Sequence, residues 1–190
     1  MSIQALGEAL WDKTEKVRPA VSRGGYYYAL YREITEMAGA YASDGFRFYE
    51  EGDTVNAHAA ITYGFGWLDC GCLLGIFTDI AALDDLPVIK ETVAPKLESH
   101  LKEKTARYQR MLTDALESVI INPDKESPVH QAAVVVMNKA ERHLKKAGQS
   151  IKDGNRLQAL GELSYGYGFL DAGIRAGLLR VKKNRHLFTI

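Results

Sequence analysis

Apolar residues recur at helical spacing along nearly the whole chain, and this pattern predicts an all-α protein without β-strands. The residue before a proline is pushed out of the helical conformation, so helices should end near Pro19 and Pro123. Tight glycine-containing turns at 51–53 and 153–155 should join antiparallel helices. The expected helices span 3–17, 26–51, 54–78, 96–120, 128–152 and 156–181.

The third helix in each set of three carries nearly the same sequence. Tyr-Gly-Phe-Gly-Trp-Leu-Asp-Cys-Gly-Cys-Leu-Leu-Gly at 63–75 returns as Tyr-Gly-Tyr-Gly-Phe-Leu-Asp-Ala-Gly-Ile-Arg-Ala-Gly at 165–177, with seven identities and a constant offset of 102 residues. This indicates an internal duplication. We expect two tandem three-helix up-and-down bundle repeats, 1–83 and 84–190, packed into one compact helical body. A link at about 78–95 joins them and contains a short helix from Pro87.

Small residues form a stripe along this duplicated helix. Glycine costs a helix about 1 kcal/mol relative to alanine, so the stripe should permit close approach by another helix. The helix is apolar nearly all round and should therefore be central. We infer that the two copies pack on each other across a pseudo-two-fold axis. The glycines assigned to close packing are Gly64, Gly71, Gly75, Gly166, Gly173 and Gly177.

Each copy of this helix also carries one carboxylate in apolar surroundings, Asp69 and Asp171. Burying a carboxylate is costly unless it is paired or hydrogen-bonded. One interpretation is a ligand-facing or general-base group. The alternative is a structural acceptor for a helix N-terminus, a tyrosine hydroxyl or an arginine such as Arg175, four residues from Asp171. The candidate ligand-facing polar residues are Asp69, Asp171, Thr62, Ser164, Tyr63 and Tyr165.

Composition narrows the function classes. The 190 residues carry 24 basic and 24 acidic side chains, so no global field favours nucleic acid or a membrane. No apolar run is long enough to span a bilayer, and we expect a cytoplasmic protein. Cys70 and Cys72 are two positions apart on a helix and should be reduced filler. The five histidines show no metal-ligand spacing, and we expect no metal, no cofactor and no catalytic residue.

Two local features carry further alternatives. Tyr26, Tyr27, Tyr28 and Tyr31 should pack against the core, although stacking on bases or sugars is the other interpretation. A basic run near the end of the last helix is a candidate phosphate-contacting patch. Its Arg180 and His186 are six residues apart, and this spacing resembles the Arg–His motif of HEPN ribonucleases. The run comprises Arg180, Lys182, Lys183, Arg185 and His186.

The Gly-Asp hairpin at 52–53 is followed by Tyr-Gly-Phe-Gly-Trp-Leu-Asp-Cys-Gly at 63–71. This combination resembles an archaeal family, domain of unknown function 357, whose members show a Gly-Asp hairpin and a Tyr-x-x-Gly-Trp-Leu-Asp-x-Gly helix. The resemblance covers 41–77 and 143–179; the second copy departs from it at Asn155, Gln158 and Phe169. It implies a three-helix up-and-down bundle in each copy and brings no activity.

From these observations we expect a non-enzymatic binding or scaffold module, with an unknown protein partner on the outer helices. It would be a monomer or a homodimer and would not engage a membrane. The first alternative is a small-molecule binder or an enzyme that uses Asp69 and Asp171. The second is an RNA-binding protein that uses the basic C-terminal run.

Overall fold

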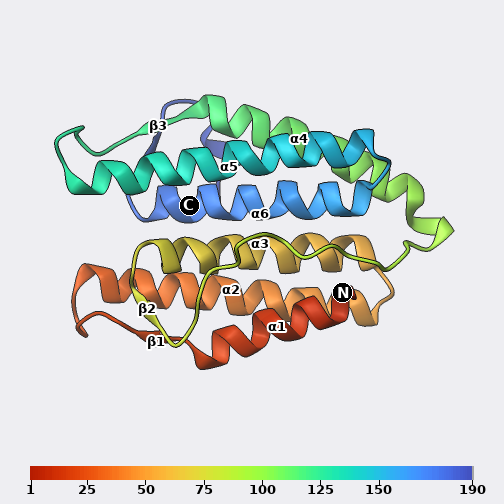
Figure 1. Cartoon of the computed structure of the whole chain (residues 1–190), viewed down its shortest axis with the longest axis horizontal. Coiled ribbons are helices and arrows are strands. Elements are labelled where there is room, and N and C mark those ends of the chain that lie inside the picture. Colours follow the sequence, from red (N-terminus) through yellow and green to blue (C-terminus); the bar gives the residue numbers. More distant parts are fainter. Residues whose placement is uncertain (190) are drawn as a thin grey trace.

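The computed structural model describes residues 1–189 and is built from six long helices (Figure 1). The predicted all-α class is confirmed. Helices α1, α2 and α3 form one half, and α4, α5 and α6 form the other, with α3 and α6 adjacent at the centre. The helices are α1 (Ile3–Lys16), α2 (Tyr26–Glu50), α3 (Thr54–Leu73), α4 (Glu98–Ser118), α5 (Pro128–Lys152) and α6 (Arg156–Arg175).

The third helix of each repeat ends earlier than expected. Gly75 and Gly177 have φ angles of 66° and 74°, which reverse the chain just beyond α3 and α6. The expected ends at 78 and 181 are therefore wrong. These two glycines end helices and do not serve close packing, because a Cβ on Gly75 would meet nothing within 4 Å and one on Gly177 only a tyrosine hydroxyl at 3.8 Å.

The reversed chain forms short strands, so the expectation of none is also wrong. In the first repeat β1 (Arg18–Pro19) pairs antiparallel with β2 (Phe77–Thr78). In the second, β3 (Val119–Ile121) pairs with β4 (Leu179–Val181). The registers Arg18–Thr78 and Ile120–Arg180 differ by 102 residues at both positions. Each strand pair thus ties the end of the first helix to the end of the third.

The link between the repeats is not helical from residue 79 to 94, so the short helix expected at Pro87 is wrong. The link binds the start of α1 instead: the Lys90 amide donates to the Met1 carbonyl oxygen, and the Ile3 amide donates to the Glu91 side-chain carboxylate. Leu86 and Ile89 are buried against the helices. A 3₁₀ turn at Pro95–Leu97 (η1) leads into α4, and another, η2 (Arg185–Leu187), follows β4.

Glycines at the centre of the molecule let α3 and α6 touch backbone to backbone. A Cβ on Gly66 would lie under 3.0 Å from the Tyr165 carbonyl oxygen. A Cβ on Gly168 would lie equally close to the carbonyl oxygen of Tyr63. The contact is reciprocal under the 102-residue offset, as the inferred pseudo-two-fold arrangement requires.

The predicted glycine stripe faces elsewhere. A Cβ on Gly64 would lie 3.3 Å from the Ala38 carbonyl oxygen of α2, and one on Gly166 would lie 3.5 Å from that of Ala140 in α5. Gly71 lies against the Phe77 ring and Gly173 against Val136. These four glycines therefore serve packing within a repeat, whereas Gly66 and Gly168 serve packing between repeats.

Within residues 1–189, no helix is long and apolar enough to cross a membrane.

We expect Gly66→Ala to destabilise the protein by about 3 kcal/mol, because neither backbone can move away from the added methyl group without separating α3 from α6. Gly168→Ala should do the same. Chemical denaturation measures the free energy of unfolding.

Gly39→Ala is the matched control, since a Cβ at this α2 position would meet nothing within 4 Å. It should stabilise the protein by up to about 1 kcal/mol through helix propensity. If Gly66→Ala were as well tolerated as the control, the central backbone contact would be refuted.

Candidate functional site

The two repeats are cross-linked by a reciprocal pair of buried hydrogen bonds. The Tyr63 hydroxyl of α3 donates to Asp171 Oδ2 of α6 at 2.5 Å. The Tyr165 hydroxyl of α6 donates to Asp69 Oδ2 of α3 at 2.7 Å. Each carboxylate also accepts a backbone amide from the segment that follows its helix, Leu83 at 3.0 Å for Asp69 and Thr189 at 3.5 Å for Asp171. The two aspartates are thus used by the fold.

Burial dominates the electrostatics of both carboxyl groups. It raises the pKa of Asp69 and of Asp171 from 3.8 to about 6, although the tyrosine hydroxyls partly oppose the shift by stabilising the charged form. The Oδ1 atom of each has no hydrogen-bond partner among the described residues. A charge held with half its acceptors unused destabilises the fold at neutral pH.

The other predicted polar residues do not join the aspartates. The Thr62 hydroxyl donates to the His58 carbonyl oxygen of its own helix at 2.7 Å, and the Ser164 hydroxyl has no partner among residues 1–189. Arg175 does not pair with Asp171. It forms a two-pronged ion pair with Glu33 of α2, at 2.6 and 2.7 Å, because the α6 end points it towards the other repeat.

A cavity of about 260 Å³ lies between the repeats, next to the Tyr63–Asp171 bond. We name it the tyrosine pocket after its four tyrosines, which come from α2, α3, α4 and α6. The described lining residues are Tyr41, Phe48, Asn56, Ala59, Ala60, Tyr63, Lys104, Tyr108, Met111, Tyr167, Leu187 and Thr189.

Lys104 of α4 is the one cation in the lining of the tyrosine pocket, and its residue is only 8% exposed. Its ammonium donates to Asn56 Oδ1 and lies 5.1 Å from the centre of the Tyr108 ring. Within residues 1–189 no carboxylate lies within 4.0 Å of it. Burial is the largest influence on the pKa of Lys104 and lowers it below its usual 10.5, with Asp53 and Glu103 opposing the shift.

Sequence reasoning missed Lys104, Asn56 and three of the four tyrosines. A signal was present for Lys104, because it lies on the buried face of α4 between Leu101 and Tyr108, three and four residues away. The pocket itself had no signal, since its walls come from four helices and from the chain after α6.

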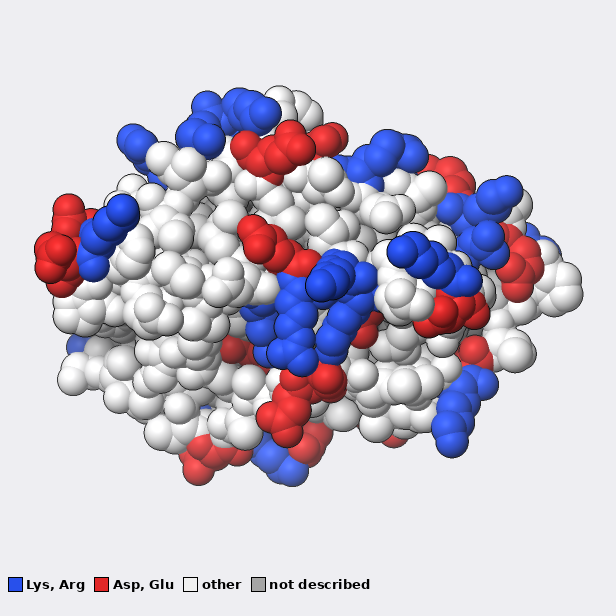
Figure 2. All heavy atoms as spheres, turned by 45° about the horizontal axis from the view of Figure 1, so that its top comes forward, with Lys and Arg blue, Asp and Glu red and all other residues white. Residues whose placement is uncertain are grey.

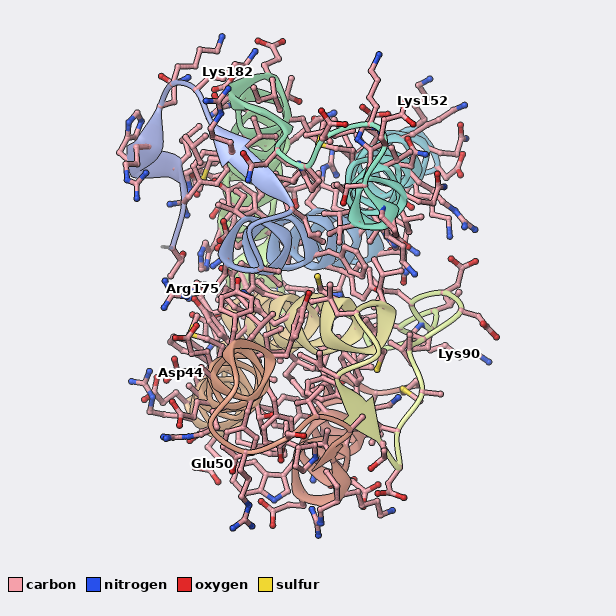
Figure 3. All side chains as sticks on the ribbon, turned by 90° about the vertical axis from the view of Figure 1, so that its left-hand side faces the viewer. Asp44, Glu50, Lys90, Lys152, Arg175 and Lys182 are labelled. Atoms are coloured by element: carbon pink, nitrogen blue, oxygen red, sulfur yellow. The ribbon has the colours of Figure 1, made fainter. Side chains whose placement is uncertain are left out.

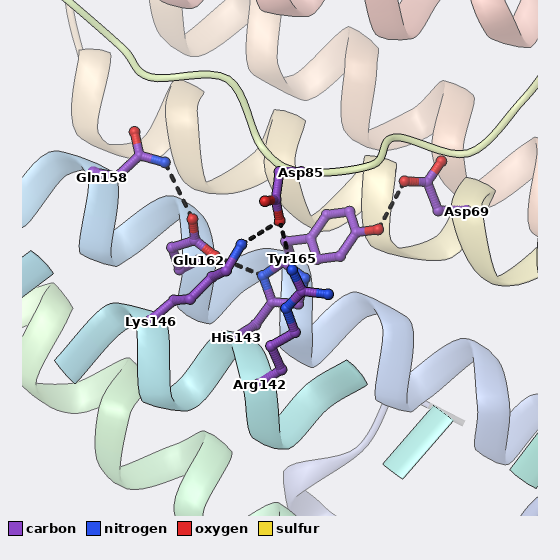
Figure 4. A network of polar contacts seen from close by, with 8 residues as sticks. All are labelled: Asp69, Asp85, Arg142, His143, Lys146, Gln158, Glu162 and Tyr165. Carbon is purple, nitrogen blue, oxygen red and sulfur yellow. Dashed lines mark hydrogen bonds and ion pairs between the residues drawn. The ribbon is translucent and has the colours of Figure 1, made fainter. Parts of the chain in front are cut away.

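The corresponding place in the other half of the molecule holds a network of polar side chains (Figure 4). Tyr41 and Ala60 correspond by the 102-residue offset to His143 and Glu162, whose side chains join at 2.6 Å and are buried. Gln158 donates to Glu162 at 3.2 Å and accepts the Ile89 amide of the link. Above them Asp85 of the link pairs with Arg142 and Lys146.

The basic run does not lie at a helix end as expected, because α6 ends at Arg175. Arg180 is on β4, Arg185 and His186 are in η2, and Lys182 and Lys183 lie between. Arg175, Arg180 and Arg185 line one hollow on the surface, whereas Lys182, Lys183 and His186 are not part of that lining.

Comparison with known proteins identifies each repeat separately. A family model described as "Protein of unknown function (DUF357)" matches residues 8–77 and again 107–179. No curated protein and no solved structure shows a significant match to the chain. The two matched segments correspond to the two halves of the duplication and together cover most of the chain.

We expect Asp69→Asn to alter how stability depends on pH. Because the folded-state pKa of Asp69 is raised to about 6, the carboxyl contributes stability that is complete below pH 3.8 and lost as pH rises through 6. The loss is about 1.4 kcal/mol per unit of pKa difference. Asparagine stays neutral, so the melting temperature of the variant relative to wild type should rise from about pH 4 to about pH 6 and change little above about pH 7.

Asp84→Asn, which removes an exposed carboxylate of the link, is the control and should leave the difference flat. His58, whose pKa burial lowers to about 4, changes stability in the opposite direction but is present in both proteins and cancels. A flat or falling difference for Asp69→Asn would contradict the prediction.

Proposed function

The chain belongs to the DUF357 family, which carries no known activity, and on the geometry of this member we propose that it binds a small anionic molecule in the tyrosine pocket. One observation carries the proposal: the buried Lys104 ammonium faces a cavity, and no carboxylate pairs with it among residues 1–189. A buried cation without a counter-ion is strongly disfavoured. An anion bound in the pocket would supply the missing counter-charge.

The surroundings of Lys104 compensate its charge only in part. Asn56 bridges it to Asp53, since the Asn56 amide donates to Asp53 Oδ2 at 2.6 Å while its oxygen accepts from the lysine. Glu103 pairs with Arg107 at 3.1 Å on the surface and does not contact the lysine. An anionic group of a ligand in the pocket would therefore meet a cation that is already desolvated and already positioned.

The walls indicate the rest of the ligand. Tyr41, Tyr63, Tyr108 and Tyr167 present ring faces and edges, which suit a flat or apolar body. Two of their hydroxyls are engaged, because Tyr63 donates to Asp171 and Tyr167 donates to the Leu187 carbonyl oxygen. The pocket thus offers shape and one charge, which supports binding without catalysis. A protein partner on the outer helices stays a prediction.

The asymmetry of the duplication supports a single ligand site. In one half Glu162, Gln158 and the link occupy the space; in the other, Ala60 and Asn56 are shorter and leave it open. A purely structural interface between repeats has no need for this difference. A cavity also costs stability, since it forfeits packing contacts.

Lys104→Met tests the proposal with three probes that share a benzene ring and differ in charge: phenyl phosphate, benzyl alcohol and benzylamine. Calorimetric titration of the wild type should show phenyl phosphate binding at least about tenfold more tightly than the other two, a difference of about 1.4 kcal/mol. The variant should lose this preference. Because it removes a buried charge, it should be as stable as wild type or more so.

Lys102→Met is the matched control, a lysine two residues away that is exposed on the same helix, and it should bind phenyl phosphate as wild type does. Equal affinity of the wild type for all three probes would refute an anion site. So would a Lys104→Met protein that keeps the preference.

A further inference from the structure

The end of the molecule at which α6 stops carries a hollow lined by arginines. Arg175 from the end of α6, Arg180 from β4 and Arg185 from η2 meet Asn122 of the α4–α5 connection around a space of about 340 Å³. We name it the arginine hollow. In Figure 3, which looks onto this end, Arg175 lies where the two repeats meet and Lys182 lies above it beside β4. The arginine hollow and the tyrosine pocket share no lining residue.

The exposed Tyr26 ring lies beside Arg175 of the hollow, and the Tyr27 ring packs against that of Tyr26. Tyr26 and Tyr27 begin α2 and are 61% and 49% exposed, so the expectation that they pack against the core is wrong. The Tyr26 hydroxyl lies 3.8 Å from the position of a Cβ on Gly177, and Tyr26 and Arg175 line a second, smaller hollow together. Arg175 is common to both hollows and connects the tyrosines to the arginines.

Of the three arginines of the hollow, one is already paired with a carboxylate. Glu33 neutralises Arg175 through two short contacts, which hold it in place between the repeats. Within residues 1–189, no carboxylate lies within 4.0 Å of Arg180 or Arg185, and both are exposed. The protein as a whole is neutral, and basic and acidic groups are interspersed on the face drawn in Figure 2. Attraction for an anion would therefore be local to this end.

We propose that this end binds single-stranded nucleic acid, with a phosphate in the arginine hollow and a base on the Tyr26 and Tyr27 rings. Arginine contacts phosphate through several donors at once, and exposed aromatic rings stack on any base. The Tyr26 and Tyr27 rings lie edge to face at 72°, so one ring face is presented beside the other ring's edge. An anionic membrane or an acidic peptide would use the arginines alone and would leave the rings without a role. This inference does not depend on the tyrosine pocket.

A labelled oligouridylate of about ten nucleotides, titrated into the full-length protein and followed by fluorescence anisotropy, tests the proposal. Binding should weaken as salt rises from about 50 to about 200 mM. The double variant Arg180→Gln, Arg185→Gln should lower the slope of log affinity against log salt by about 0.7, the value for one phosphate contact on a single strand. Tyr26→Ser, Tyr27→Ser should weaken binding about tenfold and leave the slope unchanged.

The matched control is Lys90→Gln, Lys152→Gln, which removes one exposed cation from the link and one from the end of α5, both outside the arginine hollow, and should bind as wild type does. Melting temperatures establish that each variant is folded. Absence of binding at low salt, or equal loss in the control, would overturn the proposal. It would also be overturned if polyglutamate or anionic vesicles displaced the oligonucleotide equally well and the tyrosine variant bound normally.

Discussion

The backbone contact between α3 and α6 is the constraint on which the rest of the structure depends. At Gly66 and Gly168 the two helices approach so closely that neither position has room for a methyl group. This distance brings Tyr63 within reach of Asp171 and Tyr165 within reach of Asp69. Wider separation by one side chain would leave two buried carboxylates without their main donors, which is a larger cost than either hydrogen bond returns. The tyrosine–aspartate hydrogen bonds therefore depend on the close approach of the two helices at the glycines.

The duplication makes the contact between α3 and α6 symmetric, and sequence differences between the repeats make its surroundings asymmetric. The strand registers and the tyrosine–aspartate bonds repeat with an offset of 102 residues. The flanks do not repeat: His143 and Glu162 form a buried pair where Tyr41 and Ala60 border a cavity. A fused pair of repeats can diverge in this way because a change in one copy does not enforce the same change in the other, as it would in a homodimer.

The buried ionisable groups fall into two kinds that burial alone would not separate. Asp69 and Asp171 each accept a tyrosine hydroxyl and a backbone amide through Oδ2, while Oδ1 of each has no partner among the described residues. Lys104 donates to one neutral partner, lines a cavity and has no carboxylate within 4.0 Å in residues 1–189. The aspartates thus join the two repeats through their hydrogen bonds, whereas a ligand anion would complete the contacts of Lys104.

The sequence by itself determined the helices, the duplication and the central place of α3 and α6, because helical periodicity, prolines and internal identity are local or self-comparing signals. Helix ends were less accurate at α3 and α6, which end just before Gly75 and Gly177, ahead of the residues that pair as strands with a distant segment. Only the tertiary structure decided which glycines bring the repeats together, because Gly64 and Gly66 differ in sequence only by position on the helix. Likewise Lys104 became a candidate through walls supplied by α2, α3 and α6, and Arg175 came to line hollows with both Arg180 and Tyr26 through the packing of one repeat on the other. Such sites depend on distances across the fold, which no pattern along the chain records.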